Sequence, residues 1–326
     1  MHVQTPPEIS IVIPVYNEAL NLPELYKEIT KSCARLGKTV EILFIDDGSQ
    51  DGSFEVLKDI QAADSRIRII RLRKNFGQTA SLSAGFDHAR GEVIITLDAD
   101  LQNDPKDFGL LLTKIEDGFD LVSGWRINRK DKLLTRRLPS TLANKLISII
   151  TGVKLHDYGC TLKAFKKDVI KNIKLYGELH RFIPAIASHM GVSIAEVKVN
   201  HRPRKHGKSK YSVFRFLKVV LDLLTVKFLL SYSTRPLQIF GFHGMCSGII
   251  GGLIGLYLSY QRLVLKVGIA NRPLLLLSIL LVVIGIQFIS LGLLAEIIVR
   301  TYHESLQKRI YFVQEIIESE PVKSSD

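Results

Sequence analysis

The chain has 326 residues, 46% of them hydrophobic, with a mean hydropathy of +0.16 and a formal net charge of +12. This hydrophobic content is high for a soluble enzyme, so part of the chain is predicted to lie in lipid. The charge calls for an anionic partner, which composition leaves open between nucleic acid, anionic lipid and phosphorylated substrates. The cysteines Cys33, Cys160 and Cys246 lack paired spacing, which argues against a zinc site and a disulfide framework.

From residue 9 to 126 the sequence alternates apolar segments with amphipathic helical patterns. Strands are predicted at 9–16, 40–49, 67–72, 92–100 and 120–126, and helices at 22–36, after Asp51 and at 78–89. Strands separated by helices of this length predict right-handed βαβ units, and hence an α/β domain with a mostly parallel sheet covered on both faces. Ligands of such sheets bind beyond the carboxyl ends of the strands.

The fourth predicted strand, EVIITLDAD, ends in Asp98 and Asp100. Alternate side chains of an extended chain face the same way, so both carboxylates are predicted to project to one side. Such a pair suits a hard cation, Mg²⁺ or Mn²⁺, that keeps its other positions for water and phosphate oxygens, and Gln102 would add a neutral oxygen. The alternative is a solvated acidic loop that caps the next helix.

Two other strand ends carry polar residues. Pro14 and Tyr16 lie at the end of the first predicted strand with Glu18 just after it, and Asp46 and Asp47 lie near the end of the second. Pro14 and Tyr16 are predicted to pack against a base, and Asp46 or Asp47 to accept hydrogen bonds from a base or ribose. Plain turn chemistry also explains Asp-Gly-Ser. Neither a dinucleotide fingerprint nor a P-loop occurs, which argues against an oxidoreductase and a P-loop ATPase.

Two basic segments follow. The first, INRKDKLLTRRLPS at 127–140, suits an anionic acceptor, although a charge run is by default solvated. The second has seven Lys or Arg from Arg202 to Lys218, and no acid occurs between Glu196 and Asp222. No nucleic-acid motif accompanies it, so attraction to anionic lipid and diphosphate is the better interpretation. Within it, Arg202 and Lys208 are the predicted ligands of substrate phosphate.

No charged residue occurs from 236 to 261 or from 273 to 295. Each stretch can span a hydrocarbon core of about 30 Å as a helix, and the short loop between them predicts a hairpin. The flanking basic residues predict cytoplasmic termini, and no signal-peptide pattern precedes the first strand. Glycines at 244, 248 and 252 permit close helix contact, in an oligomer or a tight hairpin equally.

The predicted domains are therefore a cytoplasmic catalytic domain at 1–211, an amphipathic interface helix region at 212–235, two transmembrane helices within 236–299 (about 236–261 and 273–297), and a cytoplasmic tail at 300–326. The expected location is a bacterial inner membrane, with the chain crossing it more than once. A homo-oligomer, dimer or tetramer, is among the expected partners.

The motifs PVYNE, IDDGS, NFGQTASLSAGF, DADLQNDP, SGWR, DYGC and H-R-x-R-x-x-G-x-S-K-Y, in this order, resemble those of the polyisoprenyl-phosphate glycosyltransferases of family 2. That group includes dolichol-phosphate mannose synthase and bactoprenol glucosyltransferases. The resemblance spans roughly residues 9 to 235 by motif. It implies a GT-A fold and the inverting transfer of a hexose from a nucleotide sugar to polyprenyl phosphate.

The resemblance also implies residues for the acceptor. Arg126, Arg136 and Ser140 would contact the lipid phosphate, with Arg137 as an alternative to Arg136, and Asp157 would lie near the acceptor as a possible base. A phosphomonoester has its second pKa near 6, so at neutral pH it is already largely an oxyanion and no proton need be removed. Orientation of a basic side chain, or a structural role, therefore stays open for Asp157.

The resulting hypothesis is a metal-dependent enzyme with Asp100 and Asp157 as candidate catalytic residues, UDP-glucose as the favoured donor, and GDP-mannose or UDP-linked amino sugars as alternatives. A processive polysaccharide synthase would need a longer transmembrane pore and a Q-x-x-R-W segment, and Trp125 is not in one. A catalytically silent sugar-nucleotide-binding or membrane scaffold protein is the rival from another class.

Overall fold

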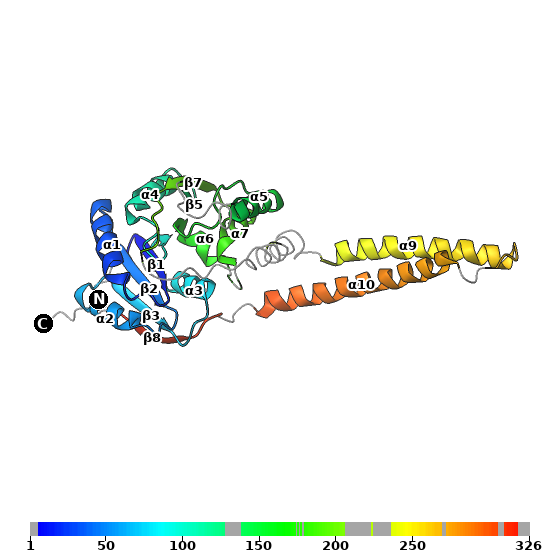
Figure 1. The fold of residues 1–326 in the computed structure, drawn as a ribbon, viewed down its shortest axis with the longest axis horizontal. Coiled ribbons are helices and arrows are strands. Elements are labelled where there is room, and N and C mark those ends of the chain that lie inside the picture. Colours follow the sequence, from blue (N-terminus) through cyan, green and yellow to red (C-terminus); the bar gives the residue numbers. More distant parts are fainter. Residues whose placement is uncertain are drawn as a thin grey trace. The chain divides into compact units, whose positions relative to one another are not determined.

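The computed structural model describes residues 6–127, 138–173, 175, 177, 179–205, 223, 236–268, 272–305 and 310–318. The chain divides into two compact units, Met1–Val226 with Arg309–Asp326, and Lys227–Lys308. The first unit carries the sheet, and the second carries two long helices (Figure 1). Apart from Leu223, the predicted interface helix region at 212–235 lies outside the described residues.

Within the described part of the first unit, eight strands form one mixed sheet in the order β7-β5-β6-β4-β1-β2-β3-β8. The pairs β1–β2, β1–β4, β2–β3 and β5–β7 are parallel, whereas β6 and β8 run antiparallel to their neighbours. The strands are β1 (Ile9–Val15), β2 (Val40–Asp46), β3 (Ile67–Leu72), β4 (Val93–Thr96), β5 (Leu121–Arg126), β6 (Lys163–Lys166), β7 (Ile194–Val199) and β8 (Val313–Ile317).

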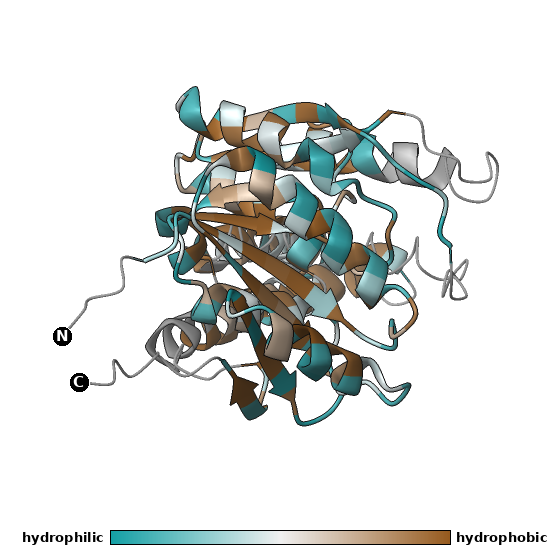
Figure 2. Ribbon diagram, turned by 90° about the vertical axis from the view of Figure 1, so that its left-hand side faces the viewer, coloured by the Kyte–Doolittle hydropathy of each residue, from teal (hydrophilic) through white to brown (hydrophobic). Residues whose placement is uncertain are grey.

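Helices cover both faces of this sheet. Helices α1, α2 and α4 contribute to the same core cluster as Ile11 and Ile13 of β1, while α3 lies on the other face, where Gly85 approaches Val12. The helices of the first unit are α1 (Leu22–Leu36), α2 (Ser53–Ala63), α3 (Gln78–His88), η1 (Pro105–Asp107), α4 (Phe108–Glu116), α5 (Leu138–Thr151), α6 (Lys167–Lys171), η3 (Leu179–Arg181) and α7 (Ile183–His189). Figure 2 shows apolar strands between helices with hydrophilic outer turns.

The predicted fold class is confirmed, and α1 has the predicted bounds because its apolar residues recur at helical spacing and Gly37, with φ of 63°, ends it. The fourth strand was predicted too long. It ends at Thr96, and a turn that includes Leu101 at φ 60° follows, so strand alternation does not place Asp98 and Asp100. The sequence analysis also missed β6, β7 and β8, the last of which lies in the predicted tail.

The second unit consists of α9 (Pro236–Leu263) and α10 (Pro273–Ser305), which run side by side (Figure 1). By length and composition, the segments Leu237–Leu263 and Pro273–Ala295 can each cross a membrane. The Ser247 hydroxyl donates to the Leu281 carbonyl, and the Ser278 hydroxyl donates to the Gly251 carbonyl, both at 2.8 Å. These bonds between the helices satisfy polar groups that lipid cannot.

The glycines that allow this approach differ in part from the predicted set. A Cβ at Gly285 would lie 2.7 Å from the Gly244 carbonyl oxygen and 2.9 Å from the Gly248 nitrogen, and one at Gly251 would lie 2.8 Å from the Ser278 carbonyl oxygen. A Cβ at Gly252 would meet nothing within 4 Å. The contact between α9 and α10 therefore depends on Gly285, Gly244 and Gly251, and the predicted Gly252 lies outside it.

We expect Gly285→Val to separate the two helices, because the obstructing atoms are backbone and the strain of such overpacking is about 1–3 kcal/mol. Gly252→Val is the matched control. Oxidative cross-linking of cysteines placed at 247 and 281, in a variant without the natural cysteines, should fall several-fold in the first variant and stay unchanged in the second. Equal cross-linking would contradict this helix contact.

Candidate active site

The loops after β1 and β2 hold each other in place. The Asn17 backbone N–H donates to Ser49 Oγ at 3.0 Å, and the Glu18 N–H donates to Ser53 Oγ at 2.9 Å. Gly48, at φ 70°, is required in the second loop because a Cβ there would lie 2.7 Å from the Lys74 backbone. Pro14, the second-last residue of β1, therefore lies beside a fixed loop.

The two carboxylates at the end of β2 have different partners. Asp47 accepts hydrogen bonds from the backbone N–H groups of Phe76 at 2.7 Å and Gly77 at 2.9 Å, so it fixes the start of α3. Asp46 is fully buried, and its Oδ2 has no hydrogen-bond partner among the described residues, although Arg71 Nε lies 3.6 Å away. Desolvation raises the pKa of both carboxyls. Asp46 thus has one side-chain oxygen, Oδ2, that can still accept a hydrogen bond, whereas both side-chain oxygens of Asp47 already accept one.

Asp98 and Asp100 lie close together in the turn after β4. Desolvation and the negative charge of Asp100 raise the pKa of Asp98 to about 6, and Asp98 accepts a hydrogen bond from Gln78 Nε2 at 2.8 Å. Asp100 is buried and ion-paired with Arg204 Nη2 at 2.6 Å. Two carboxylates that repel each other fit a divalent cation.

The described residues offer such a cation few protein ligands. In the part of the chain that the structure describes, no group of three or more His, Cys, Asp or Glu side chains gathers as a metal site. The Gln102 side-chain amide donates to the Arg202 carbonyl at 3.4 Å. A cation held by Asp98 and Asp100 would therefore need further oxygens from a substrate and water, which suits a nucleoside diphosphate.

Three cations of the segment 202–205 tie it to the site. Arg202 bonds to Glu28 at 2.7 and 2.9 Å, and its Nη2 lies 2.7 Å from Asp104. Lys205 pairs with Glu24 of α1. The predicted phosphate ligand Arg202 is thus engaged in these ion pairs, whereas Arg204 reaches the carboxylate pair. Lys208 lies outside the described residues.

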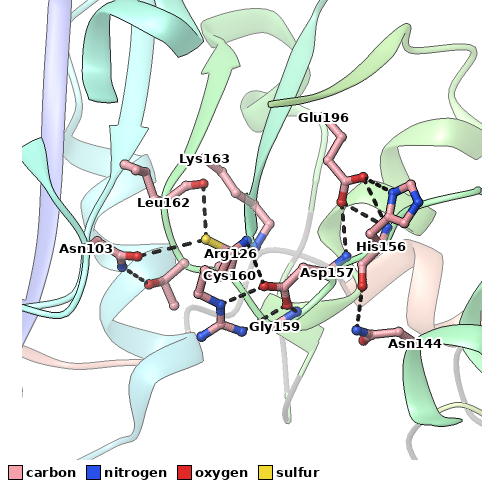
Figure 3. Close-up of polar contacts among 11 residues, drawn as sticks. Asn103, Arg126, Asn144, His156, Asp157, Gly159, Cys160, Leu162, Lys163 and Glu196 are labelled. Carbon is pink, nitrogen blue, oxygen red and sulfur yellow. Dashed lines mark hydrogen bonds and ion pairs between the residues drawn. The ribbon is translucent and has the colours of Figure 1, made fainter. Parts of the chain in front are cut away.

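Arg126 and Asp157, which were predicted to lie near the acceptor, form a fork (Figure 3). Arg126 Nε and Nη2 donate to the two oxygens of buried Asp157 at 2.6 and 2.9 Å, and the Gly159 N–H donates to Oδ1 at 3.1 Å. Glu196 accepts from the backbone N–H groups of Asp157 and His156, which fixes this turn. The oxygens of Asp157 are therefore engaged in orienting a guanidinium, which favours the orienting role over that of a base.

A buried lysine lies beside both groups. Lys163 of β6 is 4% exposed, and its ammonium donates to the Cys160 carbonyl. Desolvation lowers the pKa of Lys163, and the nearby negative charges of Asp157 and Asp98 offset only part of this shift. Lys163 is thus placed to balance negative charge between the two carboxylate groups.

The structure therefore brings together the predicted residues Asp98, Asp100 and Gln102 in one turn, and Arg126 with Asp157 in one fork. Arg136 lies outside the described residues, and Ser140 is in the first turn of α5 with its side chain outside them. The sequence analysis missed the roles of Gln78, Lys163, Glu196 and Arg204. Gln78 and Arg204 belonged to quoted motifs, and that was the signal available for them.

Residues 10–174 match the model of Glycosyl transferase family 2. Dodecaprenyl-phosphate galacturonate synthase of Rhizobium johnstonii is 42% identical over 317 residues, which cover 96% of this chain and 94% of the relative. Undecaprenyl-phosphate 4-deoxy-4-formamido-L-arabinose transferase of Shewanella sediminis is 40% identical over 327 residues, covering 99% and 97%.

Among solved structures, glucosyl-3-phosphoglycerate synthase of Mycobacterium tuberculosis, bound to Mn²⁺, uridine diphosphate and phosphoglyceric acid, superposes with a TM-score of 0.54 at 17% identity. The match covers 68% of this chain and 78% of that one, and it shows the fold alone. The fold is thus of the GT-A type, that of a glycosyltransferase. The chain belongs to glycosyltransferase family 2, as predicted.

The raised pKa of Asp98 predicts how the stability of the fold depends on pH. Its folded pKa of about 6 exceeds the usual 3.8, so the folded state binds more protons between these values and stability falls as pH rises through this window. We expect Asp98→Asn, with metal chelated, to raise the midpoint of thermal unfolding at pH 7.5. The difference should vanish below about pH 4.

Asp120 is the opposite case, because Lys166 and Ser193 lower its pKa to about 2. Its stabilising contribution is complete above the unfolded pKa and is lost as pH falls toward 2. Asp120→Asn should therefore lower the midpoint at pH 7.5. Calorimetry of both variants in detergent checks these two predictions. A lower unfolding midpoint for Asp98→Asn than for the wild type at pH 7.5 would contradict the repulsion between Asp98 and Asp100.

Proposed function

We propose that the protein transfers a glycosyl residue from a nucleotide sugar to polyprenyl phosphate at the cytoplasmic face of a bacterial membrane. The observation that carries this proposal is the close pair Asp98 and Asp100, paired with Arg204 and lying just beyond a strand end of the GT-A sheet. Two relatives that match nearly the whole chain are named for a polyprenyl phosphate.

The donor's base would lie beside Pro14 and Tyr16, with Asp46 accepting a base N–H. Asp46 is the better candidate of the two neighbouring carboxylates because its Oδ2 is buried without a hydrogen bond to any described residue, while Asp47 is engaged by two backbone N–H groups. Desolvation raises the pKa of the Glu18 carboxyl, and the nearby negative charge of Asp100 adds to this shift.

Asp98 and Asp100, with Gln102 as a further oxygen, would hold Mg²⁺ or Mn²⁺, which as a Lewis acid supplies neutralisation of the leaving diphosphate. Arg204 is placed to bind a diphosphate oxygen once Asp100 has another partner. Arg202 holds its segment against α1 and the loop before η1, and Lys208 remains a proposed phosphate ligand.

On the acceptor side, Arg126, Arg136 and Ser140 would bind the lipid phosphate, whose oxyanion attacks the anomeric carbon with inversion. Asp157 would orient Arg126 through the observed fork. Because the phosphate is already largely ionised at neutral pH, Asp157 has no proton to remove. Exclusion of water near the lipid headgroups would favour transfer over hydrolysis.

The names of the relatives guide the choice of sugar. The relatives are named for galacturonate and for 4-deoxy-4-formamido-L-arabinose, so we propose a UDP-linked uronic acid or 4-amino sugar ahead of UDP-glucose, with GDP-mannose last. The proposed orientation, with the catalytic unit and both termini in the cytoplasm, rests on the basic residues that flank the hairpin.

One experiment tests donor, metal and orientation together. Inverted membrane vesicles containing the protein and undecaprenyl phosphate receive radiolabelled UDP-galacturonate, UDP-4-deoxy-4-formamido-L-arabinose, UDP-glucose and GDP-mannose in turn. We expect label in the lipid fraction with one of the first two, its loss in EDTA or with Asp100→Ala, and no transfer in intact right-side-out vesicles. Absence of transfer from every donor would favour the binding scaffold instead.

The role of Asp157 is tested by Asp157→Asn. Loss of charge from the fork should lower kcat/KM for the acceptor roughly 10- to 100-fold, as expected from about 1.5–3 kcal/mol for a charge-assisted hydrogen bond, and leave the donor KM within a few-fold. The loss should be equal from pH 6 to pH 9. A base would instead become dispensable above the second pKa of the acceptor, so recovery of rate at high pH would contradict the orienting role.

A further inference from the structure

The strand β8 joins the sheet from a distant part of the sequence, after both helices of the second unit. It pairs antiparallel with β3, and the Arg73 N–H donates to the Phe312 carbonyl at 3.0 Å. Tyr311, 2% exposed, donates its hydroxyl to Asp87 of α3 at 2.7 Å. Glu318 accepts from Arg68 and Arg90 at 2.8 and 2.9 Å. The segment 311–318 is therefore anchored at both ends.

Between these anchors, β8 reaches the nucleotide end of the sheet through one row of charges. Asp46, Arg71 and Glu315 are register partners across β2, β3 and β8. The Arg71 Nη1 donates to Glu315 at 3.2 Å, while its Nε is 3.6 Å from Asp46 Oδ2, and its guanidinium lies 3.9 Å from the centre of the Phe54 ring. Arg71 is thus shared between two carboxylates and held over an aromatic ring.

This sharing leaves the Asp46 Oδ2 beyond hydrogen-bond distance of Arg71. If Glu315 did not hold the far end of the guanidinium, Arg71 would be drawn onto Asp46 and would occupy the oxygen that a base N–H needs. The segment that contains β8 also contacts the residue that binds Asp47. Phe312 packs against Phe76 with ring centres 6.0 Å apart, and the Phe76 N–H donates to Asp47.

We propose that β8 is a positioning strand for the nucleotide site, in which Glu315 restrains Arg71 and so keeps Asp46 available to a nucleoside diphosphate. This inference rests on the proposed function, since it takes Asp46 as the acceptor for the base. Glu315 does not touch the substrate, so it acts through Arg71 alone.

The test measures binding of UDP and of GDP, with Mn²⁺, to the full-length protein in nanodiscs by calorimetry, and continues with whichever the wild type binds more tightly. Glu315→Gln should weaken binding roughly two- to five-fold, the range for a partly exposed ion pair, with kcat at saturating donor and KM for the acceptor within two-fold. Glu92→Gln, an equal charge change at an exposed ion pair with Lys167, is the control and should bind as wild type does.

A double variant separates positioning from a merely structural effect. In an Asp46→Asn background, Glu315→Gln should cause no further loss, because its influence passes through Asp46. If Asp46→Asn weakens binding but Glu315→Gln matches Glu92→Gln, or if the two losses simply add, the positioning role is overturned and the proposed function stands. If Asp46→Asn binds as the wild type does, or neither nucleotide binds, the proposed donor site itself is wrong.

Discussion

Negative charge at one edge of the sheet is the constraint on which the first unit depends. Strands β1, β2 and β4 run parallel, so their carboxyl ends meet, and desolvation raises the pKa of Glu18, Asp46 and Asp98 there. A buried carboxylate persists only when cations or hydrogen bonds compensate for lost hydration. Arg71 and Arg204 supply this compensation from β3 and from the segment after β7. Each of these arginines contacts only one oxygen of its carboxylate. The carboxylates at this edge can therefore still bind a cation or accept a hydrogen bond from a ligand.

Elements that are stabilised by local interactions could be predicted from the sequence, and elements that depend on partners distant in sequence could not. Helix α1 was predicted to the residue because its amphipathic period and the terminal Gly37 are local signals. Strand β6, only four residues long with lysines at both ends, and β8, with glutamate at its centre, lack a clear apolar run. Both strands form through pairing with partners distant in sequence, and β8 follows the two long helices α9 and α10, so no local pattern indicated that it belonged to this sheet.

The candidate site shows the same division. The types of residue and their strand ends were predictable, since motifs place carboxylates after apolar runs. The choice between Asp46 and Asp47 depends on two backbone N–H groups about thirty residues away, and only the structure shows them. Arg204 meets Asp100, whereas Arg202, the predicted phosphate ligand, pairs with Asp104, and only the structure shows this difference between the two arginines. The predicted alternation of side chains from Asp98 to Asp100 was wrong, because the strand ends earlier and a turn with Leu101 in the left-handed region follows it.

The place of β8 in the sequence also bears on how the protein is made. The ribosome completes the strands from β1 to β7 before it makes the hairpin, so β3 has an unpaired edge until residues 313–317 emerge. Unpaired edges of apolar strands attract other chains, and β3 carries Ile67, Ile69 and Ile70. If α9 and α10 entered a membrane during translation, the nascent chain would stay tethered there until β8 is made, and the unpaired edge of β3 would be kept apart from other copies. Premature termination within the hairpin would yield a chain that has every carboxylate of the site but an unprotected, aggregation-prone sheet.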